Sequence, residues 1–201
     1  AQRYGRSLME EIPEIDALIG TGECGLCVEA VQGALCGERP VLIGGPGFLA
    51  EEGGPRVIAT PGHFAYVKIA EGCANRCSFC LIPSLRGPAK SRPVEAIVRE
   101  AESLASSGAR ELIVIAQDTT AYGRDLYGRP SLARLLRELA GVEGIDWIRV
   151  MYTYPSLIDD ELIEVFAGED RIVKYLDIPM QHGSDNVLRM MNRRSSREQM
   201  I

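Results

Sequence analysis

Hydrophobic and polar positions change their spacing near residue 64, and this change divides the chain into two parts. Before residue 38 the pattern predicts a short helix at residues 8–12, a buried strand at 15–19 and a helix at 23–35. From residue 64 onward, short apolar runs alternate with stretches whose apolar residues recur every three or four positions. This alternation of strands and helices predicts an α/β fold with a parallel sheet.

The second part contains four strand–helix units. Its strands are predicted at residues 64–70, 111–116, 147–152 and 173–178. Each is followed by a helix, and these helices are marked by Pro93 at the start of the first, Gly141 at the end of the second, and Asp159 and Ser184 as caps of the third and fourth. Right-handed crossovers would make the strands parallel, in a sheet that either curls into a barrel or stays open.

The segment between the two parts, residues 38–62, is rich in glycine and proline. Such a composition favours turns over regular structure. We therefore expect an interdomain linker, with a short strand at residues 41–43.

Polar and aromatic residues follow each predicted strand of the second part. They are Glu71, Gly72 and Cys73 after the first strand, Gln117, Asp118 and Thr119 after the second, Tyr152 and Tyr154 after the third, and Gln181 and His182 after the fourth. The C-terminal ends of parallel strands meet at one face, where α/β enzymes build their active sites. The sequence therefore predicts one shared site at this face.

Composition and charge exclude several classes of function. The chain of 201 residues has a formal net charge of −6, and residues 1–62 account for most of it, with nine acidic and four basic side chains. Neither part has the basic excess of a nucleic-acid-binding domain, so we expect no direct contact with nucleic acid. No apolar run is long enough to cross a bilayer, and the start of the chain lacks the apolar core of a signal peptide, so we expect a cytoplasmic protein.

Three cysteines, Cys73, Cys77 and Cys80, lie within eight residues at C-x3-C-x2-C spacing. Three thiolates can hold three corners of a cubic [4Fe-4S] cluster and leave the fourth iron open, whereas ferredoxin motifs supply four cysteines. An open iron can bind a substrate or cofactor. Zinc is a second interpretation, but a structural zinc site needs a fourth ligand, and unligated thiols are a third.

Several neighbours of the cysteines are candidates for cofactor binding. Phe79 could shield the cluster or stack on a flat ring. Arg92, with Arg76 and Arg86, could pair with an anionic carboxylate or remain solvated. Gln117 and Asp118 lie at the shared face, although Asp118 could instead be a turn residue and His182 a structural histidine. No catalytic residue is assigned.

The cysteine motif, with an aromatic residue before its last cysteine, resembles that of the radical S-adenosylmethionine enzymes. The surrounding segments resemble the methylthiotransferase family, and its RimO-type branch in particular. These segments are residues 60–63, 66–73, 82–87, 91–93, 117–119 and 176–182. The MiaB-type branch, which modifies tRNA adenosine, typically has Gln-Asn after the second strand where this chain has Gln117-Asp118.

The resemblance implies a domain organisation. Residues 1–37 would be the C-terminal part of a flavodoxin-like methylthiotransferase N-terminal domain, 38–62 the linker, and 63–201 a truncated radical SAM core, a partial (β/α) barrel. The chain is thus expected to be an internal piece of a longer protein. Cys24, Cys27 and Cys36 do not match the family's second cluster; Cys24 and Cys27 are expected to pack in the core as small apolar side chains.

The resemblance also implies an activity. It indicates a radical SAM methylthiotransferase that adds a methylthio group to the β-carbon of an aspartate in the small-subunit ribosomal protein uS12. Cys73, Cys77 and Cys80 would hold the [4Fe-4S] cluster that binds S-adenosylmethionine, with an external electron donor and a second [4Fe-4S] cluster in the full-length protein only. The alternatives are a MiaB-type tRNA enzyme and a non-catalytic metal-binding module.

Overall fold

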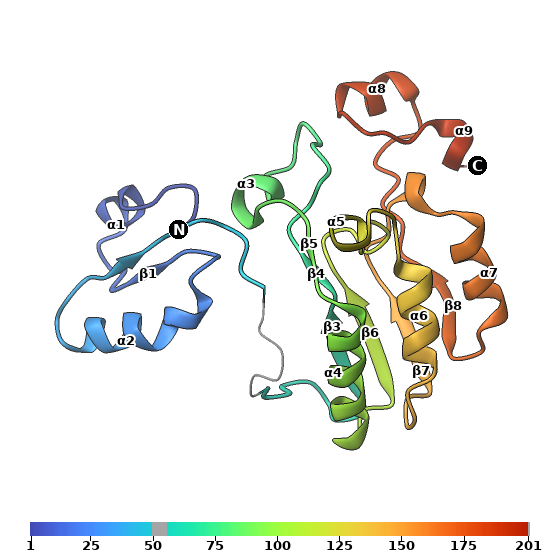
Figure 1. The fold of residues 1–201 in the computed structure, drawn as a ribbon. Helices are drawn as coiled ribbons and strands as arrows, with labels where there is room; N and C mark the ends of the chain where they lie inside the picture. The colour runs from blue at the N-terminus through green and yellow to red at the C-terminus, as the bar shows by residue number, and fades with distance from the viewer. Residues whose placement is uncertain (50–55, 201) are drawn as a thin grey trace.

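A four-stranded parallel sheet forms the centre of the computed structural model, which describes residues 1–49 and 56–200. Its strands are β3 (Phe64–Lys68), β6 (Glu111–Ile115), β7 (Trp147–Val150) and β8 (Ile172–Leu176), and they lie side by side in chain order (Figure 1). Ala65 lies opposite Leu112, and Leu112 opposite Ile148, so alternate residues of successive strands share a face. The predicted α/β class and parallel sheet are confirmed.

Three helices cover one face of this sheet: α4 (Val94–Ser106), α6 (Leu132–Ala140) and α7 (Asp160–Gly168) (Figure 1). Each follows a strand or the hairpin beside it, as expected for crossover connections. Asp159 caps α7, because its Oδ1 accepts a hydrogen bond from the Leu162 backbone N–H at 2.9 Å. This confirms the predicted cap, whereas Ser184 occupies the N-cap position of α8 without a capping side-chain hydrogen bond.

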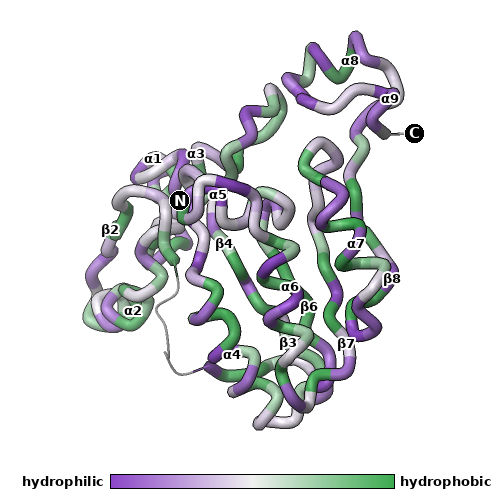
Figure 2. The backbone as a smooth tube through the Cα atoms, turned by 45° about the vertical axis from the view of Figure 1, so that its right-hand side comes forward, coloured by the Kyte–Doolittle hydropathy of each residue, from purple (hydrophilic) through white to green (hydrophobic). Residues whose placement is uncertain are grey.

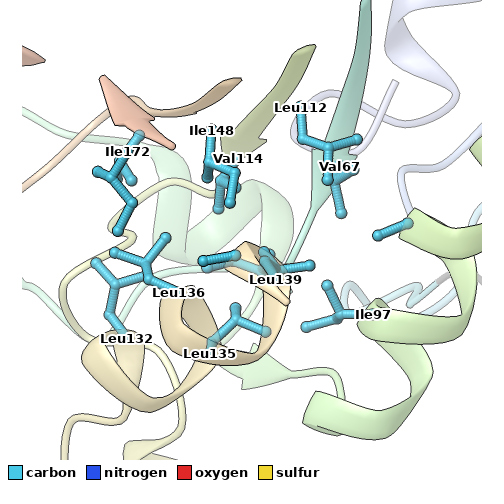
Figure 3. Packing of buried hydrophobic residues seen from close by; sticks show 14 of the residues in the cluster. Val67, Ile97, Leu112, Val114, Leu132, Leu135, Leu136, Leu139, Ile148 and Ile172 are labelled. Atoms are coloured by element: carbon cyan, nitrogen blue, oxygen red, sulfur yellow. The ribbon is translucent and has the colours of Figure 1, made fainter. Parts of the chain in front are cut away.

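The core lies between the sheet and these helices. Figure 3 shows Leu136 and Leu139 of α6 facing strand residues such as Ile148. These three side chains are fully buried, and each buried aliphatic side chain of this size contributes about 1.5–3 kcal/mol to the hydrophobic free energy of folding. Hydrophobic and hydrophilic segments alternate along the strands and neighbouring helices (Figure 2). The core therefore fixes the strands whose C-terminal ends carry the candidate site.

The opposite face of the sheet is more polar. Arg149 in β7 donates from Nε to Glu111 Oε1 in β6 at 2.7 Å, and its guanidinium lies 5.9 Å from the ring centre of Tyr175 in β8. Tyr66 in β3 is exposed on this sheet. Among the described residues, β3 and β8 are the edges of an open sheet.

The N-terminal part is a small α/β unit. It contains α1 (Ser7–Glu11), β1 (Leu18–Ile19), the 3-10 turn η1 (Cys24–Leu26), α2 (Cys27–Leu35) and β2 (Val41–Leu42). β2 falls inside the predicted linker and pairs in parallel with β1, which confirms the short strand expected there. Residues 50–55 of that predicted linker lie outside the described residues, and the domain boundaries stay a prediction.

The expected burial of Cys24 and Cys27 is wrong. Both thiols are exposed, as is Cys36. Val28, Val31 and Leu35 on α2 are also exposed, and Ala30 is the residue of this helix that is buried. The physical reason is size, since a sheet of two short strands covers only one side of the helix.

The remaining elements are short and lie outside the four-stranded sheet and its three covering helices. They are the antiparallel pair β4 (Ala70–Glu71) and β5 (Lys90–Ser91), the helices α3 (Ile82–Arg86), α5 (Arg124–Tyr127), α8 (Asp185–Met190) and α9 (Arg197–Met200), and the 3-10 turn η2 (Pro155–Leu157). Within residues 1–49 and 56–200, none of the helices is both long and apolar enough to traverse a bilayer.

Candidate functional site

The cysteine loop, residues 73–80, leaves the sheet at a position that only glycine can occupy. Gly72 has a φ of +75°, and a Cβ atom there would lie 2.2 Å from the carbonyl oxygen of Pro88. The next residue, Cys73, donates its backbone N–H to the Gly87 carbonyl at 3.2 Å. The close approach of residues 72–73 to residues 87–88 therefore fixes the position of Cys73, the first cysteine of the loop.

The three thiols of this loop are free and partly exposed. Burial raises the pKa of Cys73, and the negative charges of Asp118 and Cys80 act in the same direction. The Cys80 backbone N–H donates to the Cys77 carbonyl at 3.1 Å, which turns the chain back toward α3. The Cys73 thiol is therefore close enough to Cys80 and to Asp118, at the end of β6, for their charges to affect its pKa.

The donor set fits an iron–sulfur cluster. It consists of three thiols on one loop, with no disulfide among the cysteines of the chain, and thiolates are the ligands that such clusters use. Among the residues that the structure describes, no three His, Cys, Asp or Glu side chains are grouped closely enough to hold a single metal ion. The assignment of Cys73, Cys77 and Cys80 as cluster ligands stays a prediction.

Asp118 joins the cysteine loop to the end of β6. Its Oδ2 accepts from Asn75 Nδ2 at 2.7 Å, and its Oδ1 accepts from Thr120 Oγ1 at 2.7 Å and the Ala121 N–H at 3.1 Å. The carboxylate is buried. Asp118 is therefore a turn residue, as one interpretation of the sequence held, and it also fixes the loop between the first two cysteines.

A second polar group lies just before Cys73 and centres on Glu71. Gln117 donates from Nε2 to Glu71 Oε1 at 2.7 Å, while Lys68 Nζ pairs with Oε2 and Arg86 lies 3.7 Å from that oxygen. Burial alone would raise the pKa of Glu71, but Lys68, the Gly72 N–H and Arg86 together hold it below its ordinary value. The Oε1 atom of Gln117 is buried and has no hydrogen-bond partner among residues 1–49 and 56–200, so this side chain keeps one free acceptor there.

The structure does not bring Arg92 to this group. Its buried guanidinium donates to Glu100 Oε2 at 2.5 Å and to the Lys68 carbonyl at 2.8 Å. These contacts attach α4 to β3. The predicted role of Arg92 in cofactor binding therefore gains no support from the geometry. Phe79, another predicted cofactor-binding residue, is exposed on the cysteine loop.

Two residues at the strand ends have backbone conformations that side chains rarely adopt. Tyr152 has a φ of +61° and Gln181 a φ of +69°. The Tyr152 N–H donates to Asp177 Oδ2 at 3.1 Å, and its carbonyl accepts from the Thr119 N–H at 3.0 Å. These bonds tie the ends of β6, β7 and β8 together. Positive φ at such bulky residues is a common mark of functional sites.

His182 lies after β8 and is exposed. Its Nδ1 accepts a hydrogen bond from the Ser184 N–H at 2.9 Å, which shapes the turn before α8. This contact matches the structural interpretation of the histidine.

Sequence reasoning missed the segment that follows α8. The Ser78 N–H donates to the Met191 carbonyl at 3.0 Å, and Asn192 Nδ2 donates to the Arg76 carbonyl at 2.6 Å. Arg193 Nη1 lies 3.9 Å from Cys77 Sγ. Hydrophobic periodicity carries no signal for such contacts, because they join polar loop residues more than 110 positions apart.

Comparison with known sequences finds close relatives. The chain is 54% identical over 199 residues to "Ribosomal protein uS12 methylthiotransferase RimO" of Pelotomaculum thermopropionicum, and 56% identical over 196 residues to the protein of the same name from Symbiobacterium thermophilum. These matches cover 99% and 98% of this chain, but 45% and 40% of the relatives. The chain thus spans less than half the length of these curated relatives.

Comparison with solved structures supports the fold. The radical S-adenosylmethionine methyltransferase TsrM of Kitasatospora setae, solved with cobalamin and a [4Fe-4S] cluster bound, superimposes with a TM-score of 0.64 at 18% identity. The match covers 96% of this chain and 44% of TsrM. The sequence profile of the radical SAM superfamily matches residues 67–201, which include the end of β3, the cysteine loop and strands β6, β7 and β8. The chain belongs to the radical SAM superfamily.

Proposed function

We propose that this chain is the radical-generating part of a methylthiotransferase that modifies an aspartate of ribosomal protein uS12. One observation carries the proposal: three free thiols lie on one loop at the C-terminal edge of a parallel sheet, and Asn75 of that loop is bonded to Asp118 at the end of β6. The named relatives support the substrate, since their identity to this chain extends over nearly its whole length.

In this proposal Cys73, Cys77 and Cys80 would hold a [4Fe-4S] cluster, and such a cluster would pass one electron from the external donor to S-adenosylmethionine. Three thiolates would leave one of the four irons without a ligand from this motif. The chain's own residues position these components: Gly72 sets the start of the loop, Asp118 holds Asn75, and Gln117 presents its unpaired amide oxygen. Orientation of reactive groups by a fixed framework is the protein's share of such chemistry.

The distribution of charge supports a protein substrate. Residues 63–201 carry nineteen acidic and eighteen basic side chains, without the basic excess that binds phosphate backbones. A cytoplasmic location with an external electron donor is part of the same proposal, because free thiols persist in reducing compartments.

The test uses the full-length protein that contains this chain, reconstituted anaerobically with iron and sulfide. We expect cleavage of S-adenosylmethionine to 5′-deoxyadenosine, with its loss in single alanine variants of Cys73, Cys77 and Cys80, and each of these variants should bind about four irons fewer than the wild-type protein, the content of one cluster. Incubation with uS12 should add the mass of a methylthio group to one aspartate.

Two results would overturn the proposal. Modification of tRNA adenosine with uS12 left unmodified would replace the substrate by that of the MiaB type. A colourless protein that holds one zinc and leaves S-adenosylmethionine intact would favour a metal-binding module without radical chemistry.

A further inference from the structure

We propose that Arg193 is a positioning residue for the Cys77 sulfur and makes a cluster bound there easier to reduce. The inference rests on the proposed function, because it concerns the cluster that the three thiols would hold. Arg193 lies well beyond the cysteine motif and was not singled out by the sequence.

The guanidinium of Arg193 is fixed on three sides. Nη2 donates to the Pro179 carbonyl at 2.7 Å, and the guanidinium carbon lies 4.0 Å from the ring centre of Tyr154. Nη1 points to Cys77 Sγ at 3.9 Å. A guanidinium stacked on an aromatic ring loses little freedom when it also donates hydrogen bonds, because its donors are held in a rigid plane.

The backbone around Arg193 is attached to the same loop. Ser78 donates its N–H to the Met191 carbonyl and its Oγ to the Met190 carbonyl, both at 3.0 Å. Asn192 has a φ of +54° and donates from Nδ2 to the Arg76 carbonyl. Residues 190–193, which we call the α8 clamp, therefore grip the loop on either side of Cys77 and fix the distance from Arg193 to its sulfur.

Arg193 also has one unused hydrogen-bond donor. Its Nε is buried and has no hydrogen-bond partner within the described part of the chain. An unpaired buried donor on a charged group is costly. The sulfur atoms of a cluster at Cys77 would give this guanidinium acceptors that the cysteine alone does not.

The consequence is electrostatic. Hydrogen bonds to cluster sulfurs and nearby positive charge stabilise the more negative, reduced form, and so raise the reduction potential. The Arg193 guanidinium would thus favour the electron uptake that must precede cleavage of S-adenosylmethionine.

The test measures, by titration of full-length protein with dithionite, the midpoint potential of the cluster held by Cys73, Cys77 and Cys80, identified as the signal that is lost in Cys77→Ala. For Arg193→Gln we expect about a tenfold lower ratio of reduced to oxidised cluster at a fixed solution potential, which is about 59 mV for a one-electron couple. Arg193→Lys keeps the charge but lacks the rigid fork of donors, so its shift should be smaller and in the same direction.

Two controls separate this effect from general damage. Arg189→Gln removes an equal charge from α8, where Arg189 Nη1 donates to the neighbouring Asn186 Oδ1 at 3.1 Å, and should leave the potential unchanged. Tyr154→Leu should lower the potential because it removes the ring under Arg193, whereas Tyr154→Phe keeps the ring, loses only the hydroxyl that accepts the Arg194 N–H at 3.1 Å, and should lower it less. The melting temperature and iron content of the apo and reconstituted variants monitor folding and loading.

The outcomes are distinguishable. The inference is overturned, and the proposed function left intact, if the wild-type protein binds a cluster and both Arg193→Gln and Arg193→Lys have the same midpoint potential as the wild type. The same holds if Arg189→Gln lowers the potential as much as Arg193→Gln. Failure of the wild-type protein to bind any cluster would overturn the proposed function and this inference with it. If Arg193→Gln does not fold, Arg193→Lys and the two Tyr154 variants decide.

Discussion

Asn75 donates from its Nδ2 to Oδ2 of Asp118 over 2.7 Å, and this bond joins the loop of the three cysteines to the second strand of the sheet. The other carboxylate oxygen is occupied by Thr120 and the Ala121 N–H. Asp118 therefore holds two segments in place at once, whereas Asn75 holds only the loop.

This asymmetry predicts different costs for two substitutions. Asp118→Ala leaves the buried donors around it without an acceptor and should lower the free energy of unfolding by about 1–3 kcal/mol. Asn75→Ala should cost less, because Asp118 keeps its bonds to Thr120 and Ala121. Urea denaturation of both variants measures the difference; equal losses would contradict the arrangement described.

Gly72→Ala should displace the cysteine loop. The added Cβ meets a backbone carbonyl at 2.2 Å, and a φ of +75° disfavours any side chain by about 1–2 kcal/mol. We expect a loss of at least about 2 kcal/mol in unfolding free energy and a lower iron content after reconstitution. Gly62→Ala is the matched control, since a Cβ there meets nothing within 4 Å. The prediction fails if both variants bind iron equally well.

Glu71 should make stability depend on pH on the acid side. Its folded pKa is lowered from about 4.5, so its contribution is present above that pH and is lost as pH falls through the folded pKa. Glu71→Gln should therefore unfold at a lower temperature than wild type at pH 7, with the gap closing below pH about 4.5. Thermal melts from pH 7 to pH 3 provide the measurement. If the difference in melting temperature between wild type and Glu71→Gln stays constant over this pH range, the charge of Glu71 is not its cause.

Tyr152 should show a conflict between stability and activity. Its left-handed backbone costs of the order of 1–3 kcal/mol, and its ring is about half exposed, with a relative exposure of 51%. Tyr152→Gly relieves the strain and should leave the melting temperature unchanged or higher, while the proposed methylthiolation activity of the full-length protein falls. Tyr152→Phe retains ring and strain and should melt like wild type. A Tyr152→Gly variant that is less stable but fully active would refute this view.

The fold was predictable where the spacing of apolar residues is regular along a whole helix or strand. Leu132, Leu135, Leu136 and Leu139 recur at helical spacing and form the buried face of α6. The strand limits were less accurate: the third was expected to reach Tyr152, but β7 ends at Val150. Tyr152 lies outside the strand because its positive φ interrupts the hydrogen-bond ladder of the sheet. A tyrosine in the sequence does not indicate that backbone conformation.

The candidate site was predictable only in its local parts. The spacing of Cys73, Cys77 and Cys80 is visible in the sequence, and so is the position of Gln117 and Asp118 after a strand. The partner of Arg92 was not, because the choice of Glu100 over a site-facing anion depends on how α4 packs beside β3. The contact of Arg193 with Cys77 spans 116 positions and depends on the completed sheet.

That span has a consequence for biosynthesis. Ser78 and the carbonyl that receives its hydroxyl are separated by 112 positions, and ribosomes add about 5–20 residues per second. Newly made thiols would therefore wait roughly 6–22 s before the α8 clamp is even synthesised. During that interval the nascent loop would be open to oxidants and to iron delivery alike, before residues 190–193 can bind it.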